Sequence, residues 1–168
     1  MTEPAWSREP EDAPFETAAW QPRLARLYAY WRARRPSDGA LPGRRHIDPV
    51  EMVWALGNVW LLDLQRAPFR LRYRLIGSRI TAHMDRDPTG EWLDVARPQV
   101  VADPGYYARY RWMAETRRAT WRCGPPRLSH DPYWKTVENV MLPLAADGTN
   151  VDMFLCASAY RRHDGEIE

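Results

Sequence analysis

Residues 137–160 read VENVMLPLAADGTNVDMFLCASAY, and this stretch decides the fold. Two apolar runs, Val137 to Leu144 and Val151 to Tyr160, flank the pair Asp147-Gly148. An Asp-Gly pair between two such runs is a strong short-range signal for a β-hairpin. The stretch therefore predicts two long antiparallel strands.

Three further strands are predicted earlier in the chain. Residues 59–64 are almost continuously apolar, which is typical of a strand covered on both faces. Residues 69–75 alternate apolar side chains with arginines, which indicates a half-exposed strand at the edge of a sheet. A broken strand over residues 120–128 contains Pro125 and Pro126, and proline is confined to edge strands.

Helices are predicted before these strands and between them. Pro22 suits a first helical turn, and an amphipathic helix should run to about Arg35, just before Pro36. Its apolar residues recur at the 0, 3, 4, 7 spacing of one helical face: Leu24, Leu27, Tyr28 and Trp31. A second long helix over about residues 105–119 presents Tyr106, Tyr110 and Met113 at the 0, 4, 7 spacing. Short helices are expected after Asp48 and over residues 77–84.

The order of these elements predicts an α+β domain. Its sheet has five antiparallel strands, its helices are inserted between strands 2 and 3, and an amphipathic helix precedes the sheet. The length of 168 residues fits one domain, which we place at residues 21–162 with a C-terminal tail over 163–168. Residues 1–20 hold five acidic side chains and one basic one, and we expect a flexible acidic lead-in there.

Composition narrows the function classes. A net charge of +2 is too small to make nucleic acid the default partner, although Lys135 is the only lysine among 24 basic residues. No apolar run is long enough to span a membrane, and no signal peptide is visible. Two cysteines, Cys123 and Cys156, make no disulfide framework, so we expect a cytoplasmic protein.

Motifs for metal, cofactor or nucleophilic chemistry are absent from the sequence. The four histidines and two cysteines lack the spacing of zinc ligands. Ser129, His130 and Asp131 are sequence neighbours, whereas catalytic triads are assembled in space. His83 is the best candidate for a haem ligand, yet no histidine lies on the helix over 105–119, and no Asn-Cys-Arg flavin motif exists. We therefore predict no cofactor, neither haem nor flavin.

Four fragments in order resemble a family of stand-alone PAS-like proteins common in alphaproteobacteria. They are Leu41-Pro42-x-Arg44-x-x-Ile47-Asp48-Pro49, Tyr73-Arg74-Leu75-x-Gly77-Ser78-Arg79-Ile80, Arg86-Asp87-x-Thr89-Gly90 and Leu142-Pro143-Leu144-x-x-Asp147-Gly148. The resemblance covers about residues 22–162. It implies a PAS-like fold and a role in sensing or signalling through a ligand or a partner protein, and it implies no reaction.

A PAS-like fold would enclose a cavity between its sheet and its central helices, suited to a small, mostly apolar ligand. The residues expected to line it are Tyr73, His83, Trp92, Tyr107, Tyr110, Met141 and Met153. A fully packed core without a ligand is the alternative. The apolar face formed by Leu24, Leu27, Tyr28 and Trp31 either covers the sheet of its own chain or forms the surface of a homodimer or partner complex.

The leading hypothesis is a PAS-like sensor or adaptor without enzymatic activity, whose output passes through a partner protein or a dimer. It predicts that the strand at 58–65 lies beside the strand at 150–160. A second hypothesis is a small α+β pocket enzyme that uses His83 with a carboxylate such as Asp85 as its base. A third is a nucleic-acid-binding module on an arginine-rich face. That face would comprise Tyr107, Arg109, Tyr110, Arg111, Trp112, Arg117, Arg118, Trp121 and Arg122.

Overall fold

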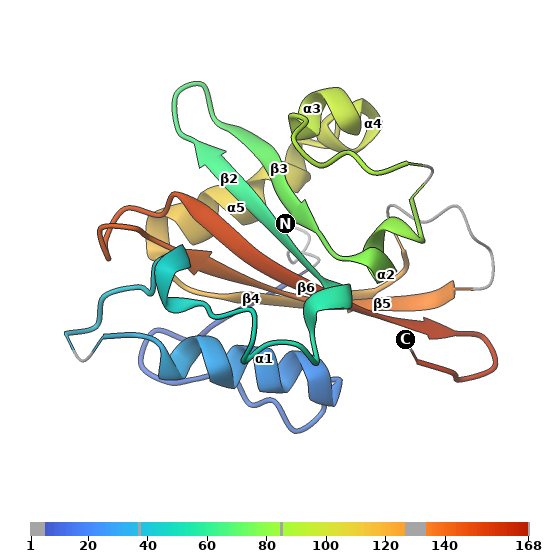
Figure 1. Cartoon of the computed structure of the whole chain (residues 1–168), viewed down its shortest axis with the longest axis horizontal. Coiled ribbons are helices and arrows are strands. Elements are labelled where there is room, and N and C mark those ends of the chain that lie inside the picture. Colours follow the sequence, from blue (N-terminus) through green and yellow to red (C-terminus); the bar gives the residue numbers. More distant parts are fainter. Residues whose placement is uncertain (1–5, 37, 85, 127–133, 168) are drawn as a thin grey trace.

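The computed structural model describes residues 6–36, 38–84, 86–126 and 134–167, and it contains a six-stranded antiparallel sheet in the order β1-β4-β5-β6-β2-β3 (Figure 1). The strands are β1 Ser7–Arg8, β2 Val59–Gln65, β3 Arg70–Ile76, β4 Thr120–Gly124, β5 Trp134–Leu144 and β6 Met153–Arg162.

The five predicted strands are present as β2 to β6, and the prediction of five strands in the sheet is wrong by one. The additional strand, β1, pairs Ser7 with Trp121 and so adds an edge beside β4. Two polar residues carry no alternating pattern, so nothing in the sequence marks them as a strand. β2 pairs with β6, Val59 opposite Ala157, which confirms the predicted neighbourhood of these two segments. β3 lies at the opposite edge, as expected.

Helices cover both faces of the sheet (Figure 1). The helices are α1 Pro22–Ala33, α2 Ser78–Thr81, α3 Leu93–Ala96, α4 Pro98–Val101 and α5 Pro104–Thr116, with short 3-10 turns at Arg44–His46 and Leu56–Asn58. α2 to α5 all lie between β3 and β4 in the chain, which confirms the predicted insertion. The short helix expected after Asp48 is a series of turns that ends in the second 3-10 segment.

Strand alternation gives the sheet two different faces. One face of β5 and β6 is aliphatic and packs against α1; we call it the α1 face. Its residues are Val140, Leu142, Leu144, Leu155, Ala157 and Ala159. The opposite face packs against α5, where Tyr110 lies edge-on to Phe154 at 5.3 Å between ring centroids; we call it the α5 face. Its residues are Val137, Asn139, Met141, Phe154, Cys156, Ser158 and Tyr160.

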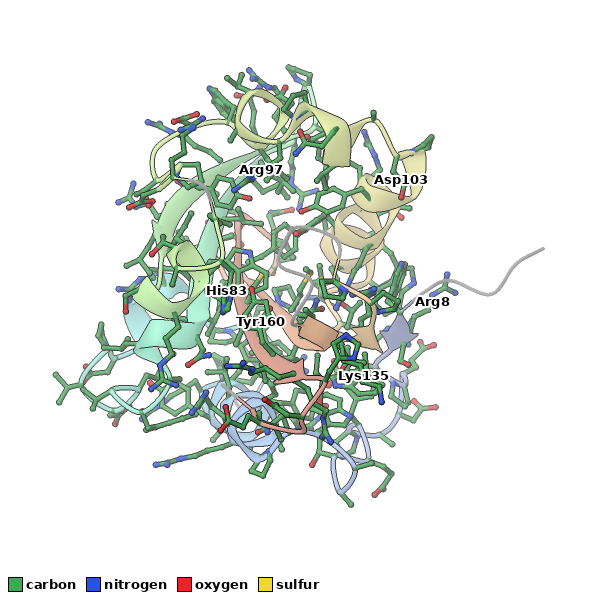
Figure 2. The ribbon with its side chains drawn as sticks, turned by 90° about the vertical axis from the view of Figure 1, so that its right-hand side faces the viewer. Arg8, His83, Arg97, Asp103, Lys135 and Tyr160 are labelled. Carbon is green, nitrogen blue, oxygen red and sulfur yellow. The ribbon has the colours of Figure 1, made fainter. Side chains whose placement is uncertain are left out.

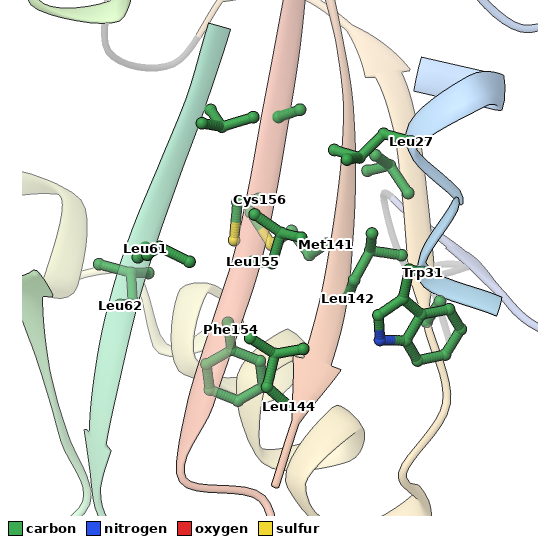
Figure 3. Packing of buried hydrophobic residues seen from close by; sticks show 14 of the residues in the cluster. Leu27, Trp31, Leu61, Leu62, Met141, Leu142, Leu144, Phe154, Leu155 and Cys156 are labelled. Carbon is green, nitrogen blue, oxygen red and sulfur yellow. The ribbon is translucent and has the colours of Figure 1, made fainter. Parts of the chain in front are cut away.

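The amphipathic helix α1 covers the sheet of its own chain. Its four apolar residues, predicted to serve either this role or a partner surface, are all buried: Leu24, Leu27, Tyr28 and Trp31. Figure 3 shows Leu27 and Trp31 directed at Leu142 on β5, and the Trp31 indole donates a hydrogen bond to the Pro143 carbonyl at 2.9 Å. The alternative that these four side chains form a partner surface is therefore corrected, because they are buried against the sheet of their own chain.

Residues 6–20 pack on the domain, where the sequence predicted a flexible lead-in. Glu9 is only 3% exposed, and its carboxylate accepts hydrogen bonds from the Tyr28 hydroxyl and from the Ala119 amide. Trp20 stacks on Trp121 at 5.4 Å between ring centroids. The acidic segment is held because its buried carboxylate finds donors on both α1 and the start of β4.

Candidate functional site

A cavity of about 90 Å³ lies between the α5 face of the sheet and the helices α2 and α5. Strands and helices supply most of its wall, and the N-terminal segment adds Trp6. The lining residues are Trp6, Trp60, Tyr73, Ile80, His83, Met84, Gly105, Tyr106, Arg109, Tyr110, Arg122, Pro126, Val137, Asn139, Met141, Ser158 and Tyr160. The wall is thus mainly apolar and aromatic, with a few polar side chains.

Four of the seven predicted lining residues meet at this cavity: Tyr73, His83, Tyr110 and Met141. The other three lie elsewhere. Trp92 lies beside β3, where the Arg70 guanidinium is 4.3 Å from its ring centroid. Tyr107 packs edge-on to Phe69, at 5.8 Å between ring centroids. Met153 begins β6 and is half-buried against the core.

Arg109 is the central polar residue of the site and is 5% exposed. Its Nε donates to Thr120 Oγ1 at 2.7 Å, and its Nη1 donates to Asn139 Oδ1 at 2.7 Å. Its Nη2 is buried and has no hydrogen-bond partner. Burial, with a smaller effect of the like charge of Arg122, lowers the pKa of Arg109 to about 10, so the guanidinium is still charged at neutral pH.

Two tyrosines of α5 stand next to this guanidinium. The hydroxyls of Tyr106 and Tyr110 are 3.4 Å apart and share a hydrogen bond. Burial raises the pKa of Tyr106 to about 12 and that of Tyr110 well above its ordinary value. Both hydroxyls therefore stay protonated at neutral pH, and since one proton is used between them, the pair retains one further O–H donor.

His83 closes the side of the cavity formed by α2 and β6. Its ring lies 4.1 Å from that of Tyr160, centroid to centroid, and Figure 2 shows the two side chains next to each other. In Figure 2, Arg97 and Asp103 lie above this pair. Arg97 directly precedes α4, and Asp103 directly precedes α5.

The polar residues that sequence reasoning missed are Arg109, Arg122, Asn139 and Ser158. Arg109 and Arg122 were predicted only as part of an arginine-rich binding face, whereas both are buried. A signal existed for Arg109, which stands three residues after Tyr106 and four before Met113. It therefore completes the 0, 3, 4, 7 pattern of the buried helical face.

The nucleic-acid hypothesis required one continuous arginine-rich face, and the structure divides these residues. Arg109 and Arg122 turn into the cavity. Arg111 lies over Phe69, with the guanidinium 4.3 Å from the ring centroid. Trp121 points to the α1 face, where it stacks on Trp20. No single surface collects them.

The pocket-enzyme hypothesis required a carboxylate beside His83. No aspartate or glutamate is among the described residues that line the cavity. Asp85, the carboxylate named for this role, lies outside the described residues, as do Ser129, His130 and Asp131. Across the described ranges, no group of three His, Cys, Asp or Glu residues is placed to hold a metal ion.

Comparison with protein families matches residues 20–94 to the PAS domain family. These residues run from the start of α1 through β2 and β3 to α3, and they include Tyr73 and His83 of the cavity wall. This part of the chain is therefore similar to a PAS domain. The six-stranded antiparallel sheet with helices inserted after β3 is consistent with that family. The comparisons with curated proteins and with solved structures found no match.

Among the described helices, none combines the length and the apolarity that crossing a bilayer requires.

Proposed function

We propose that this PAS-like domain is a sensory or signalling module that binds a small ligand in the cavity between the α5 face and helices α2 and α5. The cavity is the observation that carries this proposal. It is lined by aromatic and aliphatic side chains, together with a few polar groups, which is the usual form of a small-molecule site. No catalytic step is part of the proposal.

Ligand occupancy would be transmitted through α2. This helix is a single turn, Ser78–Thr81, and its buried residue Ile80 lines the cavity. One helical turn has little stability of its own, so its position depends on what it packs against. A ligand that contacts Ile80 and His83 would favour the arrangement in which α2 closes on the sheet.

The output would pass to a partner protein or to a second copy of the chain. α2 packs against the 3-10 turn Leu56–Asn58, and Leu56 is partly exposed there. A shift of α2 would therefore reach the surface through this turn.

Native mass spectrometry of the purified chain, followed by thermal unfolding against a panel of small molecules, tests the ligand proposal. The expected result is a retained small molecule, or a compound that binds saturably and raises the Tm. The variant Ser158→Leu places a larger side chain in the cavity wall and should abolish that binding.

Thr149→Leu is the matched control, because Thr149 is exposed in the hairpin at the other end of β5 and β6. It should bind as the unmodified chain does. A panel in which nothing binds, or binding that Ser158→Leu leaves intact, would refute the proposal. The absorbance spectrum of the same sample reports haem or flavin, either of which would contradict the expectation of no cofactor.

A further inference from the structure

A buried positive charge with only neutral partners lies in the cavity wall. Arg109 donates to a hydroxyl and to an amide oxygen, and its third nitrogen group, Nη2, has no partner. Throughout the described ranges no carboxylate forms an ion pair with it. A buried guanidinium is normally paired with an acid, because removing an isolated charge from water is costly.

Another buried guanidinium lies close to a residue of the cavity wall. Arg97 is 7% exposed, and its charge acts on Tyr73, which lines the cavity, in the direction that lowers the pKa of that tyrosine. Its Nε and Nη2 are also buried without partners. Two buried arginines, Arg97 and Arg109, thus act on tyrosines that line the cavity.

The absence of a carboxylate partner for Arg109 within the described part of the chain is the feature that identifies the ligand class. We infer that the cavity binds a small carboxylate, whose negative charge is balanced by the guanidinium of Arg109 in the cavity wall. This rests on the proposed function, in that the cavity is the ligand site, and it adds the chemical class of the ligand. A charge-assisted interaction with a carboxylate would supply the anionic partner that Arg109 lacks among the described residues.

The walls and the size of the cavity select a short apolar acid. Trp60, Ile80, Val137 and Met141 give the ligand apolar contacts, while the hydroxyl pair of the α5 tyrosines retains one O–H donor. The volume of about 90 Å³ is well below the 300 Å³ or so of a drug-sized ligand site. A short-chain fatty acid fits these limits better than inorganic phosphate, because a fully polar anion gains nothing from the apolar walls.

Titration of the full chain with sodium butyrate tests the inference. Thermal unfolding is followed at constant ionic strength, with sodium chloride, sodium phosphate and butyramide as parallel titrants. Butyrate should raise the Tm by about 3–5 °C at ten times its Kd. Butyramide, which has the same shape without the charge, should bind at least about tenfold more weakly. The side-chain Nε–H resonance of Arg109 should shift with butyrate only.

Variants locate the anion. Arg109→Met removes the charge and should abolish the effect of butyrate, whereas Arg109→Lys keeps the charge and should weaken binding while preserving the fold. Arg111→Met is the matched control, because this arginine is exposed on the same helix, and its binding should be unchanged. Equal binding of butyramide, equal binding of phosphate, or full butyrate binding by Arg109→Met would overturn the inference.

Failure of this inference and failure of the proposed function have different signatures. A neutral compound that binds and is blocked by Ser158→Leu, with no carboxylate binding from acetate to hexanoate, refutes the anion and leaves the ligand-binding function in place. No binding of any compound, charged or neutral, refutes both.

Discussion

The two faces of the sheet are built in opposite ways from the same two strands. On the α1 face, β5 and β6 present aliphatic side chains that are buried against Leu24, Leu27 and Trp31. On the α5 face, the alternate residues of these strands include Asn139 and Ser158, and they border an open cavity. One face is a packed core, and the other is a chamber with a charged side chain in its wall.

This difference separates stability from function within one sheet. Close packing against α1 provides contacts that a cavity gives up, since an empty space removes attractive neighbours from every atom that lines it. A buried arginine with neutral partners is a further cost on the α5 face. We therefore expect substitutions on the α1 face to reduce stability and substitutions on the α5 face to act mainly on ligand binding.

Two adjacent residues of β5 give the largest predicted effect and the most direct comparison. Leu142 is 0% exposed on the α1 face, and Met141 is 6% exposed in the cavity wall. Leu142→Ala should lower the free energy of unfolding by about 3 kcal/mol, because it opens a void in a packed core. Met141→Ala should cost about 1–2 kcal/mol, because part of its surface already borders empty space. Urea unfolding of both variants measures the difference.

Equal losses for the two substitutions would contradict the distinction between the faces. A larger loss for Met141→Ala would reverse it. Because both residues are apolar and lie on the same strand, differences in strand propensity do not explain a gap of this size.

The fold was predictable where the pattern was long. The hairpin of β5 and β6 followed from two apolar runs and Asp147-Gly148, and Gly148 has the positive φ of +81° that a tight turn requires. β1 was not predictable, because Ser7 and Arg8 have no pattern and owe their strand to the free edge of β4. Glu9 was assigned to a flexible segment by its charge, whereas tertiary donors bury it.

The site was predictable only in its apolar part. Tyr73, Tyr110 and Met141 were found because large apolar side chains with the right spacing point to the interior. Arg109 was not found, because residue type favours solvent for an arginine, and only its helical position indicates burial. Position in the pattern was the more reliable guide here than residue type.

A substitution in the N-terminal segment, beside the start of β4, gives a second and intermediate loss of stability. Glu9 binds the Tyr28 hydroxyl on α1 and the Ala119 amide before β4, and its carboxylate lies 3.3 Å from Arg32 Nη1. Glu9→Ala leaves these buried donors without an acceptor, so it should lower the free energy of unfolding by about 2 kcal/mol. Hydrogen exchange of the Ala119 amide should accelerate along with it.

Glu11→Ala is the control for this substitution. Glu11 is 84% exposed at its side chain and is 3.9 Å from Arg118, so its removal should change stability by less than about 0.5 kcal/mol. If Glu9→Ala and Glu11→Ala were equal, the N-terminal segment would be bound by surface charge rather than by the buried carboxylate.

The smallest predicted effect is a loss of stability at alkaline pH. It depends on the buried tyrosines, which differ between the two sides of the sheet. In the unfolded chain tyrosine titrates near pH 10, whereas burial raises the pKa of Tyr106 to about 12 and that of Tyr110 further. The folded state thus holds more protons above about pH 10, so stability should fall as the pH rises through this range. Burial lowers the pKa of Arg109 to about 10, so at this residue the folded state holds fewer protons than the unfolded chain. Its contribution therefore raises stability as the pH rises and offsets that of about one tyrosine.

Phenylalanine variants separate these contributions. Tyr106→Phe with Tyr110→Phe should flatten the decline in urea midpoint between about pH 9 and pH 11, since two of the groups that bind the extra protons are gone. Tyr28→Phe on the α1 face removes a single tyrosine, whose pKa burial raises to about 12, and should flatten it less. Arg109→Met should steepen the decline, because the opposing group is lost. If Tyr106→Phe with Tyr110→Phe left the decline unchanged, the groups that cause it would lie outside the cavity wall. The electrostatic distinction between the two faces would then be lost.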